Sequence, residues 1–204
     1  MLIIGLTGSI GMGKSAAADH FRRRGIAVCD ADAEVHKLYA GAAVPLIEAE
    51  FPGTTGADGV DRAKLAAALL KDPSAFKRLE AIVHPLVREA ERAFLSAEKA
   101  RGARMTVLEI PLLLETGGER NVDAVVVVSA PPDVQRERVL RRPGMTAEKL
   151  TQILARQMPD EEKRKRAHFV VDTGRTLDET YAQIDVVIEA LKTHTPSAYD
   201  RAWA

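Results

Sequence analysis

The 204-residue sequence has a single cysteine, no net charge and no long apolar run. With Cys29 alone the chain cannot form an internal disulfide, so a reducing cytoplasm is the simplest location, and we expect Cys29 to be an inert core residue. The 29 Lys and Arg residues balance 29 Asp and Glu residues, which gives no reason to expect nucleic acid or a membrane surface as a partner. There is no run of about 18 apolar residues and no charged-then-apolar leader, so we expect neither a membrane span nor secretion.

Motifs of other nucleotide-binding and metal-binding classes are also missing. A GTPase needs D-x-x-G after its phosphate-binding loop and N-K-x-D to read guanine, but neither occurs, and Asn121 is the only asparagine. A mechanical ATPase usually has an apolar strand that closes in adjacent acids, and no such pair is present. The histidines show no metal-ligand spacing, so we expect no zinc site.

The strongest positive signal lies at the start of the chain. The apolar run 2–7 predicts a buried strand, G-S-I-G-M-G-K-S at 8–15 fits the phosphate-loop pattern G-x-x-x-x-G-K-[ST], and the next residues are typical of a helix. Its glycines permit positive φ and close approach to a phosphate, and successive N–H groups form an anion nest. We expect a nucleoside triphosphate, with Lys14 on its β- and γ-phosphates and the Ser15 hydroxyl on Mg²⁺. The residues assigned to nucleotide binding are Gly8, Gly11, Met12, Gly13, Lys14, Ser15 and Ala16.

Buried strands alternate with helices along the chain. Strands are predicted at 2–7, 26–29, 105–110, 122–129 and 167–172. This alternation predicts an α/β protein, a three-layer α/β/α P-loop fold with a five-stranded parallel sheet. The excursion 33–101 is helical by pattern, with breaks in the turn-rich stretch 52–59 and at Asp72-Pro73 and no evident strand. We interpret it as a helical insertion that holds a second substrate. Residues 193–204, including Trp203, are expected to form a loose tail.

The segment 135–166 is more basic than the rest of this neutral chain. Its ten basic residues are Arg136, Arg138, Arg141, Arg142, Lys149, Arg156, Lys163, Arg164, Lys165 and Arg166. Its five acidic residues are Glu137, Glu148, Asp160, Glu161 and Glu162. We interpret the segment as a helical lid that neutralises phosphates, although a solvated helix face is the alternative. Arg138 and Arg142, at i and i+4, would share a face where like charges repel unless an anion lies between them.

Other polar residues are candidates for catalysis or substrate contact. Asp30 and Asp32 end the second strand, where α/β proteins bind ligands, but either could simply cap a helix. Glu109 could form a hydrogen bond with a ligand of a magnesium ion, or it could form an ion pair at the end of a strand. His84-Pro85 is predicted to start a helix, and His84 taken alone is most often structural.

Three functions compete for a chain with this phosphate loop: a small-molecule kinase, a GTPase switch and an ATP-driven mechanical or assembly protein. The short chain with a helical insertion and a lid favours the kinase. A hydroxyl close to the γ-phosphate and a carboxylate that accepts its proton would then complete the chemistry.

Taken together, these segments make the sequence resemble the dephospho-CoA kinase family over roughly residues 2–192. The resemblance rests on the segments 5–15, 30–32, 58–62, 79–85 and 111–115, and on Arg138, Arg142 and Gln157. It implies ATP-dependent phosphorylation of the ribose 3′-hydroxyl of dephospho-CoA, with Mg²⁺, in the last step of coenzyme A synthesis. It also implies a nucleotide-binding core at 1–32, 102–134 and 167–192, an acceptor-binding region at 33–101 and a lid at 135–166. We expect a cytoplasmic protein, without nucleic-acid or membrane partners, that is a monomer.

The resemblance further implies roles for single residues. Asp32 matches the general base, Lys14 and Ser15 the phosphate and magnesium groups, and Arg142, with Arg138, the lid arginines near the phosphates; His84 matches a residue near the acceptor. The sequence also departs from the family at Met12, Ala16, Glu109 and Thr173, where family members commonly carry a small residue, Thr, Asp and Asn.

Overall fold

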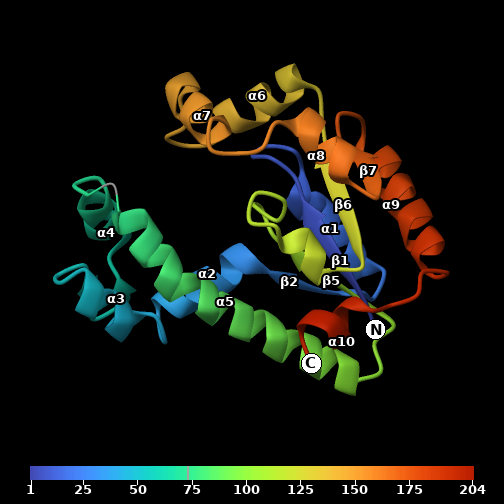
Figure 1. Cartoon of the computed structure of the whole chain (residues 1–204). Coiled ribbons are helices and arrows are strands. Elements are labelled where there is room, and N and C mark those ends of the chain that lie inside the picture. The colour runs from blue at the N-terminus through green and yellow to red at the C-terminus, as the bar shows by residue number, and fades with distance from the viewer. Residues whose placement is uncertain (73) are drawn as a thin grey trace. The chain divides into compact units, whose positions relative to one another are not determined.

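The computed structural model describes residues 1–72 and 74–204, which form two compact units, each with its own core (Figure 1). The first unit comprises Met1–Cys29 and Leu95–Ala204, and the second comprises Asp30–Phe94. Pro73, part of the break predicted at Asp72-Pro73, lies outside the described residues.

The five-stranded parallel sheet expected from the sequence is confirmed. Its strands are β1 (Leu2–Thr7), β2 (Ala27–Asp30), β5 (Met105–Glu109), β6 (Ala124–Ser129) and β7 (Phe169–Asp172). Their order is β2-β5-β1-β6-β7, with β1 parallel to β5 and β6, and β6 parallel to β7. The chain therefore reverses its direction of travel across the sheet at β1, and ligands of such sheets bind beyond the carboxyl ends of the strands at this point.

Helices pack on the sheet, which explains why its central strands are mainly apolar. Alternate side chains of β1, such as Ile4, enter a core with Phe21 of α1 (Lys14–Arg23) and Ile184 of α9 (Leu177–Leu191). The intervening residue Ile3 is fully buried, and every residue of β6 is buried. Thr176 caps α9 in a reciprocal capping box with Glu179.

The lid segment predicted at 135–166 contains most of one helix and the whole of two others. They are α6 (Pro132–Leu140), α7 (Ala147–Leu154) and α8 (Asp160–Arg166). The predicted breaks occur at Gly144, which has a φ of 73°, and at Pro159, which immediately precedes α8. The Thr146 hydroxyl accepts a hydrogen bond from the Lys149 N–H and so caps α7.

The loose tail predicted after residue 192 is wrong in its last part. Residues Ala198–Ala202 form α10, and Trp203 is only 3 % exposed. Its indole Nε1 donates to the Asn121 carbonyl at 2.7 Å, in the short helix η1 (Gly118–Asn121). Asp123 accepts hydrogen bonds from the N–H groups of Ser197 and Ala198. A five-residue helix is too short to show a helical period, so only these long-range contacts reveal that the terminus is ordered.

The second unit is mainly helical, as expected, but it also contains a strand pair that the sequence analysis missed. Its elements are α2 (Ala31–Tyr39), α3 (Val44–Glu50), β3 (Thr55–Gly56), β4 (Gly59–Val60), α4 (Arg62–Leu69) and the part of α5 (Ala75–Ala100) up to Phe94. The antiparallel pair β3–β4 lies within the predicted turn-rich stretch. Glu48 fixes this hairpin by accepting bonds from the Gly53 N–H and from the N–H and hydroxyl of Thr55.

The prediction that His84-Pro85 starts a helix is also wrong. Both residues lie inside α5, and His84 is exposed. Pro85 cannot donate to the carbonyl of Ala81, but Ala81 is exposed, so water can satisfy that carbonyl and the helix continues. Among the described residues, no helix is long and apolar enough to span a bilayer.

Candidate functional site

The phosphate loop connects β1 to α1 in a conformation that requires its glycines. Gly11 and Gly13 have φ values of 77° and 82°, in the left-handed region that side chains disfavour. Gly8 is required for space, because a Cβ there would lie 2.7 Å from the Val128 carbonyl oxygen. Gly11 and Gly13 therefore use the positive φ that glycine permits, whereas Gly8 does not.

The loop ends in a helix start suited to an anion. Gly13 is the N-cap of α1, so the N–H groups of Lys14, Ser15 and Ala16 have no partner within the helix. The first turn carries no acidic side chain, which leaves the positive end of the helix dipole uncompensated. A phosphate group fits this position because N–H groups and dipole both favour negative charge.

Lys14 and Glu109 lie close together across the sheet. The Lys14 Nζ is 3.9 Å from Glu109 Oε1, and their side chains are 17 % and 6 % exposed. Glu109 ends β5 directly beside Leu6 of β1, so the parallel register brings its carboxylate to the phosphate loop. Of the two roles left open for Glu109, the strand-end ion pair is the contact seen. The ion pair holds the Lys14 ammonium group at the loop, and the Glu109 carboxylate balances its charge, so the pair has no net charge.

The residues around this loop fit Mg²⁺ held mainly by a nucleotide. Ser15 is exposed on the first turn of α1, where its hydroxyl is accessible. Among the described residues, no cluster of three or more His, Cys, Asp or Glu side chains is arranged to hold a metal. Mg²⁺ prefers few protein oxygens together with phosphate oxygens and waters, which is the set that Ser15 and a bound triphosphate offer.

Thr173 braces the phosphate loop from outside, a role that the sequence analysis missed. Its hydroxyl donates to the Met12 carbonyl at 2.9 Å, and its side chain lies 3.3 Å from a Cβ built on Gly13. Arg138 in turn donates from Nη2 to the Thr173 carbonyl at 2.6 Å and from Nη1 to its hydroxyl at 3.3 Å. The Met12 sulfur accepts from the Ala130 N–H at 3.1 Å. These contacts make Met12 and Thr173 parts of one packed unit.

Arg138 and Arg142 were predicted to share one helix face, and this is wrong. Helix α6 ends at Leu140, so Arg142 lies beyond it in an exposed turn. Pro143 disfavours a helical conformation for the residue before it, and Gly144 then takes a left-handed conformation. Arg138 is held against Thr173, whereas Arg142 points from a turn that is open to solvent.

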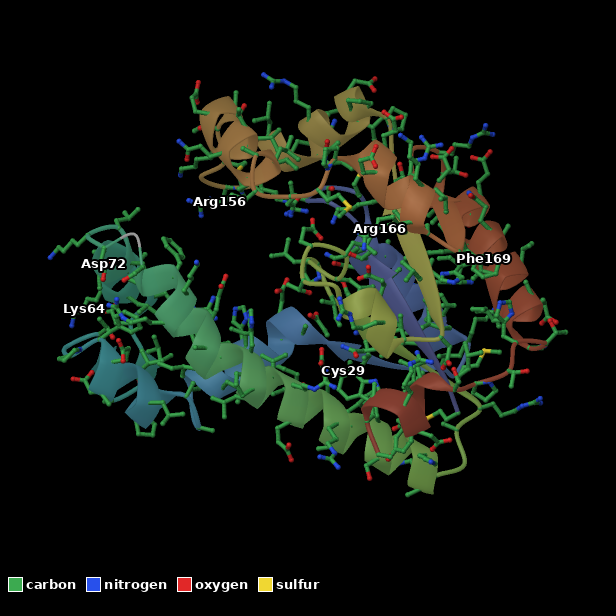
Figure 2. The ribbon with its side chains drawn as sticks, in the orientation of Figure 1. Cys29, Lys64, Asp72, Arg156, Arg166 and Phe169 are labelled. Atoms are coloured by element: carbon green, nitrogen blue, oxygen red, sulfur yellow. The ribbon has the colours of Figure 1, made fainter. Side chains whose placement is uncertain are left out.

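Helix α8, at the end of the lid segment, is tied to the loop that contains P-L-L-L-E. The fully buried Lys163 places its Nζ 2.7 Å from Glu115 Oε1. Glu115 also accepts a bond from the Met158 N–H at 2.8 Å. Arg166, labelled on α8 in Figure 2, pairs with Glu119 in η1. Two ion pairs therefore fix α8 to the segment that contains Glu115 and Glu119, within the first unit.

Asp30 and Asp32 have separate surroundings in the second unit. Asp30 caps α2, because its carboxylate accepts bonds from the N–H groups of Asp32 at 2.9 Å and Ala33 at 3.2 Å. Asp32 is exposed in the first turn of α2. Of the two aspartates that could cap a helix, Asp30 is therefore the one that does so.

Asp32 borders a groove of about 400 Å³ within the second unit. Its lining residues are Asp32, Val35, His36, Tyr39, Arg62, Leu65, Ala66, Leu69 and Leu79. The Arg62 guanidinium lies 5.4 Å from the centre of the Tyr39 ring, and burial raises the pKa of Tyr39. The groove thus combines an apolar wall, one cation and one carboxylate. His84 does not line it.

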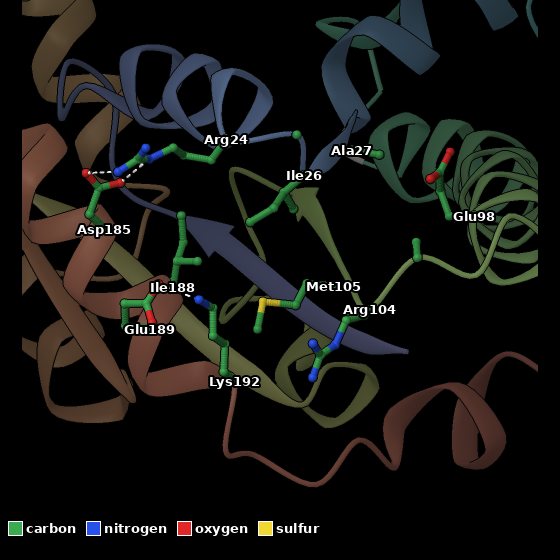
Figure 3. Close-up of a pocket in the computed structure, with 12 residues that line it drawn as sticks. Arg24, Ile26, Ala27, Glu98, Arg104, Met105, Asp185, Ile188, Glu189 and Lys192 are labelled. Carbon is green, nitrogen blue, oxygen red and sulfur yellow. Dashed lines mark hydrogen bonds and ion pairs between the residues drawn. The ribbon is translucent and has the colours of Figure 1, made fainter.

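A second pocket, drawn in Figure 3, lies at the amino end of the sheet in the first unit. Met105, the first residue of β5, and Ile26 form part of its lining. Asp185 accepts from Arg24 at 2.5 Å and 2.6 Å, and this hydrogen bonding lowers the pKa of Asp185 to about 2. Since the phosphate loop follows the carboxyl end of β1, this pocket does not belong to the nucleotide site.

Comparisons with known proteins identify the family that the chain is similar to. The model of the family described as dephospho-CoA kinase matches residues 2–179. A dephospho-CoA kinase from Rhodopseudomonas palustris is 59 % identical over 190 residues, covering 93 % of this chain and 96 % of its own. A solved structure from Thermus thermophilus is 36 % identical, with a TM-score of 0.80 and coverages of 93 % and 97 %. The dephospho-CoA kinase from Campylobacter jejuni is 25 % identical, with a TM-score of 0.70 and coverages of 93 % and 96 %.

These likenesses extend over nearly the whole chain, and the P-loop, the parallel sheet and the helical second unit lie within the matched length. The three-layer α/β/α P-loop fold predicted from the sequence is confirmed. The chain therefore belongs to the dephospho-CoA kinase family, phosphotransferases whose acceptor is an alcohol group.

Proposed function

We propose that this kinase transfers the γ-phosphoryl group of ATP to the ribose 3′-hydroxyl of dephospho-CoA, which gives coenzyme A. The observation that carries the proposal is the start of helix α1 at Gly13–Ala16. Its N–H groups without partners in the helix and the positive end of the helix dipole favour an anion there, beside Lys14. The acceptor is inferred from family membership, since the matching relatives are named dephospho-CoA kinases.

In this proposal the phosphate loop holds the triphosphate through its backbone. Gly8, Gly11, Met12 and Gly13 shape the loop, and the N–H groups of Lys14, Ser15 and Ala16 bind phosphate oxygens. The Lys14 ammonium neutralises the β- and γ-phosphates. Mg²⁺, held by the Ser15 hydroxyl and phosphate oxygens, supplies Lewis-acid stabilisation of the charge that develops on the transferred group.

The groove beside Asp32 is the proposed acceptor site. Its apolar wall suits the non-polar parts of a coenzyme A precursor, and Arg62 suits the precursor's phosphates. Asp32 is exposed at the groove and free to accept the proton of the attacking hydroxyl, whereas the Asp30 carboxylate is occupied in capping α2. His84 is proposed as an acceptor contact on the family resemblance alone.

The lid, residues 135–166, is proposed to deliver positive charge to the phosphates. Arg142, exposed in the turn after α6, is the proposed source of this charge, and Arg138 supports the loop through Thr173. We further propose a cytoplasmic monomer with a core at 1–32, 102–134 and 167–192 and an acceptor-binding region at 33–101. The single cysteine agrees with a reducing compartment.

The test is an assay for ADP release coupled to a spectrophotometric signal. ADP should form rapidly with ATP, Mg²⁺ and dephospho-CoA, and much more slowly with AMP, adenosine or shikimate as acceptor. The product should carry its new phosphate on the ribose 3′ position, which phosphorus NMR distinguishes from other sites. Equal or faster turnover with AMP would contradict the proposed acceptor.

A further inference from the structure

The peptide groups of Ile10, in the middle of the phosphate loop, are held on both sides by glutamine side chains. The Ile10 N–H donates to Gln157 Oε1 at 3.1 Å. The Ile10 carbonyl accepts from Gln135 Nε2 at 2.8 Å. Because an N–H can only donate and a carbonyl can only accept, these two contacts also fix which way each side-chain amide is turned.

The two glutamines come from two different parts of the lid, helix α6 and the connection between α7 and α8. Gln135 lies on α6 and is 7 % exposed, and Gln157 is half-buried between α7 and α8. The segment between them contains the exposed turn with Arg142 and the whole of α7. Both parts of the lid therefore form hydrogen bonds with a single residue of the phosphate loop, Ile10.

The next residue along the loop has no freedom to compensate for a shift. A Cβ built on Gly11 would lie 2.6 Å from Val139 Cγ2 and 3.1 Å from the Gln135 carbonyl oxygen, so Gly11 is wedged against α6. Thr173 holds the Met12 carbonyl from the other side. Rotation of the Ile10 peptide would thus turn the N–H groups that follow it, since the chain between Ile10 and Lys14 is packed along its length.

We propose that Gln135 and Gln157 are positioning residues that clasp Ile10 and so orient the phosphate loop for the nucleotide. The clasp makes nucleotide affinity depend on the positions of α6 and of the connection between α7 and α8. Neither glutamine needs to contact the nucleotide. The inference rests on the proposed function only in that the loop binds ATP, and it does not depend on the acceptor.

The polarity of the clasp allows a charge-matched test. In Gln157→Glu the new carboxylate still accepts from the Ile10 N–H. In Gln135→Glu the donor is lost, and the carboxylate faces the Ile10 carbonyl, so two acceptors meet. Both variants add one negative charge beside the same residue, and Gln152→Glu adds one on the exposed face of α7 as a control.

The primary measurement is the Kd of MgADP and MgATP by calorimetry, at pH 8, without acceptor. Gln135→Glu should weaken binding roughly tenfold more than Gln157→Glu, the range expected for one lost hydrogen bond and an acceptor clash. Gln152→Glu should leave binding near that of the parent. In kinetics, the KM for ATP should rise in Gln135→Glu more than kcat falls.

The pH dependence separates a polarity effect from a packing effect. A protonated Glu at 135 can donate to the Ile10 carbonyl, so the ratio of the two Kd values should shrink as the pH is lowered from 8 to 6. If Gln135→Glu fails to fold, Gln135→Met removes the donor without a charge and should raise the Kd about three- to tenfold. Equal Kd values for folded Gln135→Glu and Gln157→Glu at pH 8, or a parental Kd in Gln135→Met, would overturn the clasp. Failure of dephospho-CoA as acceptor would leave these binding results unaffected.

Discussion

The fully buried ammonium group of Lys163 lies 2.7 Å from Glu115 Oε1, which joins helix α8 to the loop after β5. A buried ion pair is costly to break from one side, because the remaining charge stays in a medium of low polarity. The Lys163 Nζ also lies 3.4 Å from the Pro111 carbonyl, so the lysine has a second acceptor when the carboxylate is changed.

Lys163→Met should lower the free energy of unfolding by about 3–5 kcal/mol, because it leaves the Glu115 carboxylate buried without its cation. The double variant Lys163→Met/Glu115→Gln should recover part of that loss, since neither charge is then present. Urea denaturation of the two single variants and the double variant measures the coupling. Lys165→Met is the control, because Lys165 is exposed on the same helix and its ion pairs are screened by water, so this variant should change stability little. An unchanged midpoint in Lys163→Met would contradict the prediction.

Lys14→Ala should reduce kcat by roughly a thousandfold and change stability little. The lost charge-assisted contact with the phosphates corresponds to several kcal/mol in the transition state. Steady-state kinetics and thermal unfolding should be measured on the same preparation. Lys192→Ala, an exposed lysine at the amino end of the sheet, should keep parental kinetics. A folded Lys14→Ala enzyme with near-parental turnover would show that the loop is not used as proposed.

Asp32→Asn should lower kcat by a factor of roughly 10² to 10⁴ while ATP binding persists, as expected for loss of a general base. Asp30→Asn should remain active, because Asn caps a helix about as well as Asp. The two variants are compared by kcat and by the Kd of MgATP. If Asp30→Asn is inactive and Asp32→Asn turns over normally, the base has been assigned to the wrong aspartate.

Hydrogen exchange should separate the two parts of the lid. Residues 141–157 should exchange more slowly when MgATP and dephospho-CoA bind, because the exposed turn at Arg142 then becomes ordered against anions. Helix α8 should be protected with or without ligands, since Lys163 and Arg166 already fix it. Mass spectrometry of peptic fragments resolves the two segments. Equal exchange of 141–157 in the free and bound enzyme would argue against a moving lid.

Glu91→Gln should stabilise the protein above neutral pH. Burial raises the pKa of Glu91 from 4.5 to about 7, with Arg88 partly opposing the shift. The folded state therefore holds this proton more tightly than the unfolded state, and the free energy of unfolding falls as the pH rises from about 4.5 to about 7. The variant should lack this loss, so its advantage should grow across that window to about 3 kcal/mol. Denaturation at pH 4.5 and pH 8, with exposed Glu89→Gln as control, measures the difference.

Much of the fold followed from local chemistry that is visible in the chain. The apolar runs at 2–7 and 122–129 predicted central strands because strands buried on both faces cannot alternate with polar residues. The glycine spacing and Lys14-Ser15 predicted the phosphate loop, since positive φ and close packing restrict those positions to glycine. The proline and glycine breaks around α7 were likewise placed correctly, because backbone restriction is a local property.

Errors arose where a contact distant in the sequence overrides the local pattern. The β3–β4 hairpin depends on Glu48, and the ordered terminus depends on Asp123 and Asn121, so neither shows a period of its own. Pro85 indicated a helix start, but packing of the apolar face of α5 keeps the helix continuous through it.

The sequence by itself determined the family, the phosphate loop and the alternation of strands and helices, because these depend on short-range residue types and spacings. Only the tertiary structure decided that Thr173, Gln135 and Gln157 support the loop and that Lys163 lies fully buried against Glu115. These partners are separated by about 50 to 160 residues, and hydrogen bonding and burial act only over a few ångströms. Their chemistry therefore exists only once the sheet has brought them into contact.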